Sequence, residues 1–192
     1  MAKLEVLIEG YADKLEDGWI VNPAVVLVQN NGKNLVVDPG CNREKLLAIL
    51  KERGLTPDDI DFVFLTHGHT DHALLAGIFE KARIFNNLEI YEGDREWEHK
   101  NRIEEMDLEI LQTPGHTPDH CSLVVPTAEG VYVVAGDVFW WIDGEEQVIE
   151  IERPDQHCEN DHAALVESRK KVLEIADFIV PGHGKVMEVN KK

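Results

Sequence analysis

The sequence predicts an α/β protein in which β-sheets are covered by helices, organised as a single domain over residues 1–192. Short runs rich in β-branched residues alternate with a few helical segments along the whole chain. No repeat, low-complexity tract or Pro/Gly-rich linker divides it. A length of 192 residues is typical of one domain and is enough to bury a sizeable core.

The elements follow from the local patterns. Strands are expected at 4–8, 20–28, 34–37, 62–65, 107–112, 122–125, 131–135 and 178–180. Helices are expected at 43–53, ended by Gly54, and at 161–176, where Asp161 can cap the first turn and Leu165, Val172, Ile175 and Ala176 form an apolar face. A weaker helix should begin at Asp71 and run through Ala76. The acidic segment 138–160 has the least pattern.

Charge and composition restrict the partners and the compartment. The formal net charge is −18 and no cluster of Lys or Arg offers a basic stripe, so we expect a small-molecule substrate rather than a nucleic acid. No apolar run is long enough to cross a membrane. The start, MAKLEVLIEG, lacks the zones of a secretory signal, and the three cysteines are scattered, so a cytoplasmic location is expected. The oligomeric state is left open.

Histidine and aspartate residues follow the apolar strands. The strands end in Gly-containing turns that carry, in chain order, Asp38, the segment THGHTDH at 66–72, His116, Asp137 and His183. In α/β architectures, sites assemble at the carboxyl ends of strands, where turns leave side chains free to converge. We therefore expect a pocket of imidazoles and carboxylates at one rim of the fold.

The segment 67–72, HGHTDH, indicates a metal site. His67 and His69 are two residues apart, so in an extended segment both rings lie on the same side and can reach one ion. Asp71 and His72 follow where the chain should turn into a helix and can reach a neighbouring position. Nitrogen and carboxylate ligands without thiolates suit zinc, with iron or manganese as alternatives.

The candidate ligands are too many for one tetrahedral zinc, and we expect two ions per chain. In this arrangement His67, His69 and His116 bind the first ion, and Asp71, His72 and His183 bind the second. Asp137 can bridge the two. Two metals about 3.5–4 Å apart would ionise a shared water near neutral pH.

The ordered motifs VVDPG, THGHTDH, TPGHT, AGD and PGHG resemble those of the metallo-β-lactamase superfamily over roughly residues 20–190. The resemblance implies a four-layer αββα sandwich with a dinuclear site on one rim. It supports the ligand roles given above, and it implies that Asp38 braces the metal loop without binding metal. The tail GDVFWW…SRKKVLEIADFIVPGHG is most similar to the small metallo-β-lactamase domain-containing protein 1 group, which is associated with RNA 3′-end processing in animals. The acidic stretch 143–160 is longer than that group would lead one to expect.

The expected function is metal-dependent hydrolysis of an ester, thioester, lactone or phosphodiester, with a hydroxide bridging two zinc ions as nucleophile. Asp71 is the expected catalytic residue, which orients the nucleophile and receives its proton. Two alternatives stay open. One is an oxidoreductase similar to persulfide dioxygenases, with one iron held by the residues matching His67, His116 and Asp137. The other is an endoribonuclease of the same fold.

The other notable polar and aromatic residues can each have a functional or a structural role. Trp140 or Trp141 can line a substrate pocket or close an edge of the core. His120 is interpreted as a structural hydrogen-bonding residue near His116 rather than a ligand. His157, Cys158 and His162, in a polar segment at a helix start, are expected to be solvated rather than a second metal cluster.

Overall fold

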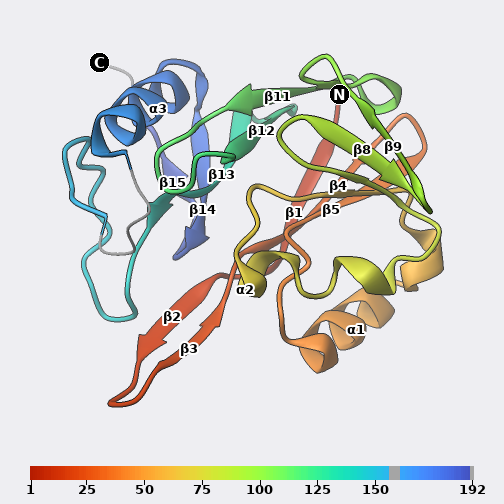
Figure 1. The fold of residues 1–192 in the computed structure, drawn as a ribbon, viewed down its shortest axis with the longest axis horizontal. Coiled ribbons are helices and arrows are strands. Elements are labelled where there is room, and N and C mark those ends of the chain that lie inside the picture. The colour runs from red at the N-terminus through yellow and green to blue at the C-terminus, as the bar shows by residue number, and fades with distance from the viewer. Residues whose placement is uncertain (156–160, 191–192) are drawn as a thin grey trace.

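Two β-sheets, a projecting hairpin and a few helices make up the computed structural model, which describes residues 1–155 and 161–190 (Figure 1). The first sheet has the strand order β1 (Lys3–Ile8), β4 (Val25–Asn30), β5 (Lys33–Val37), β6 (Phe62–Phe64), β7 (Arg83–Phe85), β8 (Glu89–Glu92) and β9 (Arg95–Glu98). The second has the order β10 (Arg102–Ile103), β11 (Leu108–Gln112), β12 (Cys121–Pro126), β13 (Val131–Trp140), β14 (Phe178–His183) and β15 (Met187–Glu188). The hairpin pairs β2 (Tyr11–Lys14) with β3 (Trp19–Asn22).

The helices are α1 (Arg43–Glu52), α2 (Thr70–Ala73) and α3 (His162–Ile175), with short 3-10 turns at Pro57–Asp59, Ala76–Ile78 and Glu104–Met106. The capping residues identified in the sequence lie at the ends of the two long helices. The Asp161 side chain accepts a hydrogen bond from the backbone N–H of Ala164 and caps α3 as expected. Gly54, with φ at +71°, follows the end of α1.

The side chains of each strand alternate between two buried layers. In β4, Val26 and Val28 pack between the sheets, whereas Val25 and Leu27 pack beneath α1. In β13, Val134 faces the other sheet, whereas its neighbours Val133 and Ala135 pack against α3. The two long helices therefore cover the outer faces of the two sheets (Figure 1), and the layers run α–β–β–α. The predicted αββα sandwich is confirmed.

Four predicted elements differ from the structure, and one of them is the strand expected at 178–180, which continues to His183 as β14. The run 20–28 is two strands, because Pro23 lacks the N–H that a continuing ladder needs and β4 starts only at Val25. Strand β13 continues to Trp140, three residues into the segment that appeared unpatterned. The helix expected from Asp71 through Ala76 stops at Ala73, and a short 3-10 turn follows.

Several short strands have no counterpart in the sequence prediction. Strand β2 and hairpin β8–β9 are mostly exposed or half-buried, so they lack the apolar runs that indicate strands. Their turns are nevertheless visible in the sequence as Asp17-Gly18 and Gly93-Asp94. His157 and Cys158 lie outside the described residues, and His162 is exposed at the start of α3 as predicted.

None of the helices in the described part of the chain combines the length and apolar character that a bilayer-spanning helix needs. The longest of them, α3, has alternating buried and exposed positions.

Candidate metal centre

The predicted ligands come from both sheets and meet at one rim. The loop after β6 in the first sheet supplies His67 and His69, and α2 supplies Asp71 and His72. From the second sheet, His116 follows β11, Asp137 lies within β13 and His183 ends β14. Strands β13 and β14 are parallel, with irregular register around Gly136, so their carboxyl-terminal halves deliver Asp137 and His183 side by side. The structure brings all seven predicted residues together.

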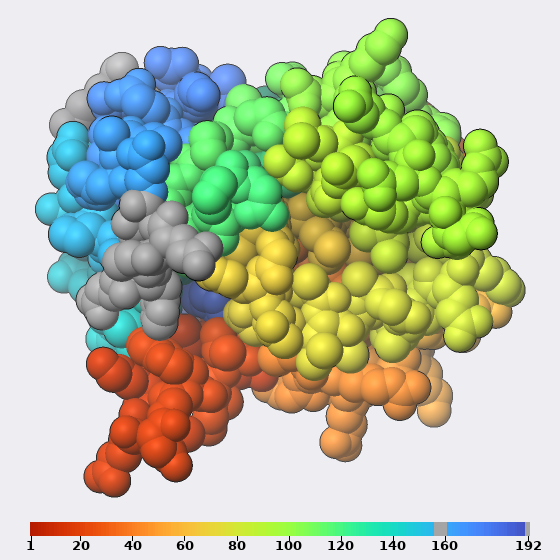
Figure 2. Space-filling model, in the orientation of Figure 1, coloured from red at the N-terminus to blue at the C-terminus, as the bar shows by residue number. Residues whose placement is uncertain are grey.

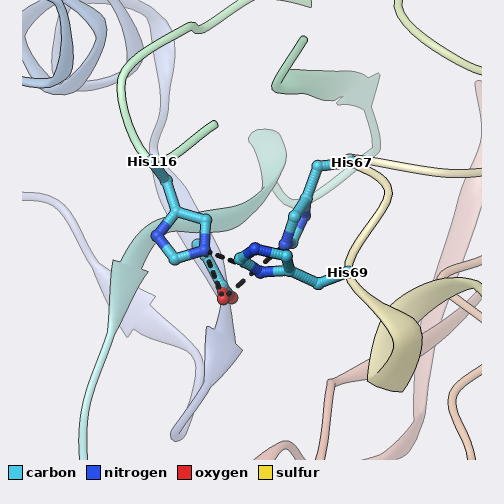
Figure 3. A group of neighbouring side chains, drawn as sticks. His67, His69 and His116 are labelled. Atoms are coloured by element: carbon cyan, nitrogen blue, oxygen red, sulfur yellow. Dashed lines mark hydrogen bonds and ion pairs between the residues drawn. The ribbon is translucent and has the colours of Figure 1, made fainter. Parts of the chain in front are cut away.

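The first group contains His67, His69, His116 and Asp137. One potential ligand atom from each residue lies within 4.8 Å of all the others. The three imidazoles point to a common position, as Figure 3 shows. His116 Nε2 is 3.1 Å from His69 Nδ1 and 3.3 Å from Asp137 Oδ2. His67 Nε2 is 3.9 Å from the same carboxylate oxygen.

The second group contains Asp71, His72 and His183, again with ligand atoms within 4.8 Å of one another. Asp71 Oδ2 is 3.6 Å from His72 Nε2 and 3.4 Å from His183 Nε2. Asp137 Oδ1 reaches this group too, at 3.4 Å from His72 Nε2 and 3.7 Å from His183 Nε2. The Asp137 carboxylate thus lies between the groups with one oxygen toward each.

Buried polar atoms at the centre test whether the residues fit metal ions. His67 Nε2, His72 Nε2 and Asp137 Oδ1 are buried and make no hydrogen bond within the described residues. Leaving such an atom unsatisfied costs about 1–3 kcal/mol, so three in one place indicate a missing partner. Divalent cations satisfy imidazole and carboxylate donors of this kind, and the donor set contains no thiolate. The residues fit a metal centre.

Asp38 braces the loop that carries the predicted ligands, as the resemblance implies. Its φ is +44°, and its Oδ1 accepts the backbone N–H of Thr66 at 2.8 Å. Its Oδ2 accepts the Thr66 hydroxyl at 2.7 Å and His72 Nδ1 at 2.8 Å. A carboxylate that accepts from Nδ1 leaves Nε2 of His72 free to face the second group.

The electrostatics keep the central carboxylate ionised. Burial alone would raise the pKa of Asp137, but His72 and His183 outweigh it and hold this pKa well below its ordinary value. Burial holds the pKa of His67 well below the ordinary histidine range, which leaves its imidazole neutral. The neutral imidazole of His67 and the ionised carboxylate of Asp137 are in the protonation states that metal binding requires.

His120 is a structural hydrogen-bonding residue, as interpreted from the sequence. Its Nε2 accepts the backbone N–H of Asp137 at 3.1 Å, and its Nδ1 is 3.0 Å from Thr113 Oγ1. Its ring stacks on His67 with centroids 5.0 Å apart. Complete burial lowers the pKa of His120 to about 3. This neutral imidazole therefore holds the Asp137 backbone in place.

The centre opens into a cavity of about 330 Å³ whose walls are largely apolar. Trp140 lines this cavity, whereas Trp141 is buried on the side of α3. Of the two roles that the sequence left open, Trp140 therefore takes the pocket wall and Trp141 the edge of the core. Hairpin β2–β3 contributes Ala12, Trp19 and Val21 as a second wall. This hairpin protrudes from the body at the lower left of Figure 2. Sequence reasoning missed these residues.

Sequence reasoning also missed Asp155 in the acidic segment. The Asp155 carboxylate lies 2.5 Å from His116 Nδ1 and 3.3 Å from Trp140 Nε1. Burial alone would lower the pKa of His116, but Asp155 and Asp137 outweigh it and raise this pKa. No spacing or periodicity in segment 138–160 marks Asp155, so no sequence signal could have separated it from the surrounding acidic residues.

A family model described as the metallo-β-lactamase superfamily matches residues 19–183. The chain belongs to the metallo-β-lactamase superfamily. Metallo-β-lactamase domain-containing protein 1 of Xenopus laevis is 34% identical over 98% of this chain and 82% of its own length. The protein of the same name from Homo sapiens is 38% identical over 78% of this chain, which spans 58% of the human protein.

Solved structures support the same metallo-β-lactamase fold. A Thermotoga maritima protein assigned to the metallo-β-lactamases has a TM-score of 0.70 at 19% identity, over 97% of this chain and 99% of its own. A protein solved in a di-iron-bound form has a TM-score of 0.63 at 24% identity and covers 87% of this chain and 90% of its own. A dizinc quorum-quenching lactonase, AidC, has a TM-score of 0.64 at 18% identity and covers 92% of this chain and 78% of its own. Members of this fold hence carry either metal.

Proposed function

We propose that this metallo-β-lactamase superfamily member is a dinuclear metal-dependent hydrolase of small molecules. The observation that carries the proposal is the Asp137 carboxylate, which has one oxygen 3.3 Å from His116 Nε2 and the other 3.4 Å from His72 Nε2. Asp137 would bridge two ions. His67, His69 and His116 would complete the first position, and Asp71, His72 and His183 the second. We include in this proposal that residues 1–192 form one domain, because both sheets share one core.

Two divalent ions in these positions would acidify a shared water and polarise the carbonyl or phosphoryl oxygen of the substrate. The protein supplies the remaining functions. Asp71 lines the cavity, and its side chain is 20% exposed, so it can contact the attacking water. Burial raises the pKa of Asp71, but its hydrogen bond with His183 and the charges of His72 and His183 together outweigh this and lower the pKa below its ordinary value. The ionised carboxylate can accept the proton of the water as the water adds to the substrate, and the leaving group departs with a proton.

The cavity favours a neutral acyl or lactone substrate over a polyanion. Its volume of about 330 Å³ is at the small end of ligand pockets, and Trp19 and Trp140 provide apolar walls. The net charge of −18 opposes a nucleic acid backbone. The lactonase activity of a protein with the same fold supports ester and lactone candidates first. Thioesters and phosphodiesters complete the set of substrates to be tested.

Metal content tests this proposal directly. The chain is purified without added metal, and zinc, iron and manganese per chain are measured by elemental analysis. Close to two ions per chain, with hydrolysis of an ester, lactone, thioester or phosphodiester, is the expected result. One iron per chain with oxygen consumption on persulfides would overturn the proposal in favour of an oxidoreductase. Cleavage of RNA alone would favour an endoribonuclease.

A double variant serves as the control for the second ion. Replacing His72 and His183 by Ala should reduce the content to one ion per chain, because the first group keeps its residues. The variant's circular dichroism spectrum verifies that the fold is retained. A native chain that contains one ion and loses none in this variant would contradict the assignment of the second group.

A further inference from the structure

We propose that Asp155 is a positioning residue that orients His116 toward the first metal position. This inference rests on the proposed function, because it assumes that His116 is a ligand. The described part of the acidic segment, residues 141–155, would then contribute to the metal centre through Asp155.

The contact determines which nitrogen of His116 faces the centre. Asp155 Oδ2 is 2.5 Å from His116 Nδ1, and the two side chains are 0% and 1% exposed. An ionised carboxylate can only accept, so Nδ1 carries the hydrogen and donates it. Nε2 then has a free lone pair, 3.1 Å from His69 Nδ1 and 3.3 Å from Asp137 Oδ2. The ring is fixed in the tautomer and orientation that a ligand needs.

The second metal position is supported in the same way. Asp38 Oδ2 accepts from His72 Nδ1 at 2.8 Å and leaves His72 Nε2 toward that group. His183 Nδ1 instead lies 3.1 Å and 3.2 Å from the backbone carbonyls of Tyr11 and Asn22. Each group therefore contains one histidine backed by a carboxylate. Partners of this kind fix ligand orientation and raise ligand basicity.

A buried arginine holds the part of the acidic segment just before Asp155 in place. Arg169 on α3 is 3% exposed, and its guanidinium donates to the backbone carbonyl of Val138 at 3.0 Å. It also donates to the carbonyls of Ile151 at 2.9 Å and Arg153 at 2.5 Å. The last of these lies two residues before Asp155. The indole N–H of Trp140 donates to Asp155 Oδ1 and fixes the other side of the carboxylate.

Metal affinity tests the role of Asp155 without depending on turnover. Zinc is titrated into metal-free native chain, Asp155→Asn and Asp155→Ala in competition with a chromophoric chelator. We expect the Ala variant to lose about 10–100-fold in affinity at one position only, as is typical for loss of such a partner. Asn retains an acceptor oxygen without the charge, so its loss should be intermediate. The absorption spectrum of the cobalt-loaded chain should change in the same order.

Two control variants accompany these chains. Glu146→Gln removes an exposed acid of the same segment and should leave both affinities unchanged. Asp38→Asn should weaken one position as well, and the loss in the Asp38→Asn/Asp155→Asn double variant should fall on both. Native affinity at both positions in the nearly isosteric Asp155→Asn and in Asp155→Ala would overturn the inference. A native chain that binds fewer than two zinc ions would instead overturn the proposed function.

Discussion

Gly182, which precedes His183, lies so close to Asp137 that a single methyl group should disable the centre. A Cβ at this position would be 1.8 Å from Asp137 Oδ1, whereas ordinary contacts begin near 3.4 Å. The φ of Gly182 lies outside the left-handed region, so alanine fits its backbone. In Gly182→Ala, the carboxylate oxygen must move by about 1.6 Å, because the Cβ is fixed to the backbone and Asp137 Oδ1 is the end of a side chain.

The displacement has a calculable effect on activity. Asp137 Oδ1 lies 3.4 Å from His72 Nε2 and 3.7 Å from His183 Nε2, so a shift of this size takes it out of the shared position. Misplacement of a reacting group by about 1 Å can cost about 100-fold in rate. We expect Gly182→Ala to lose at least this factor in kcat and one of its two ions, with an overpacking cost of about 1–3 kcal/mol in stability.

The assay is elemental analysis after dialysis, together with steady-state kinetics and thermal denaturation. Gly68→Ala is the matched control, because Gly68 also lies beside predicted ligands and a Cβ there comes no closer than 3.8 Å to any atom beyond its two chain neighbours. This control should keep both ions. Two bound ions and native turnover in Gly182→Ala would refute the assignment of Asp137 as the bridging residue.

Three further predictions concern single side chains. Asp71→Asn should keep most of the metal but lower kcat about 100–10,000-fold, the range of general base catalysis; kcat within twofold of native would rule out its role as proton acceptor. Trp19→Ala should raise KM for an apolar ester while kcat and metal content stay near native, because Trp19 lines the cavity without belonging to either group of ligands; an unchanged KM would show that the hairpin does not contact substrate. Burial depresses the pKa of His120 to about 3, so its contribution to stability is present above the unfolded pKa of about 6.5 and is lost as the pH falls toward 3. Below pH 6, each unit decrease in pH should therefore lower the free energy of unfolding by about 1.4 kcal/mol more in the native chain than in His120→Gln. Urea titrations at several pH values measure this difference, and equal slopes in the two chains would contradict the neutral state of His120.

The sequence predicts those parts of the site that depend on short motifs and on where strands end. His67, His69, Asp71 and His72 lie within one short motif, so their spacing alone indicates a shared centre. His116 follows β11 and His183 ends β14, each directly after a glycine, and their convergence depends only on the strands ending at one rim. The αββα layers follow from the resemblance and from the period-two burial of strands such as β4.

The parts that escaped prediction depend on contacts remote in sequence. Trp19 reaches the cavity because hairpin β2–β3 projects from the body, and this depends on the Asp17-Gly18 turn and on Pro23 ending the strand. Asp155 reaches His116 because Arg169, on a later helix, binds backbone carbonyls of the intervening segment. Backbone carbonyls are present at every position, so such an anchor has no signature in the sequence of the segment it holds.

The division of the seven proposed ligands between the sheets has a consequence for the stability of the fold. Four of them follow β6 of the first sheet, and His116, Asp137 and His183 belong to the second. Ions held between them would add a removable crosslink to the apolar packing and to the hydrogen bonds that already join the two sheets, such as those from the backbone N–H of Cys121 to the carbonyl of Thr66 and from that of Ala24 to the carbonyl of Gly182. At a free metal concentration of about 100 times Kd, each bound ion would add about 2.7 kcal/mol to the free energy of unfolding. Removal of the metal would then weaken the contact between the two sheets, so that activity and the free energy of unfolding would decrease together.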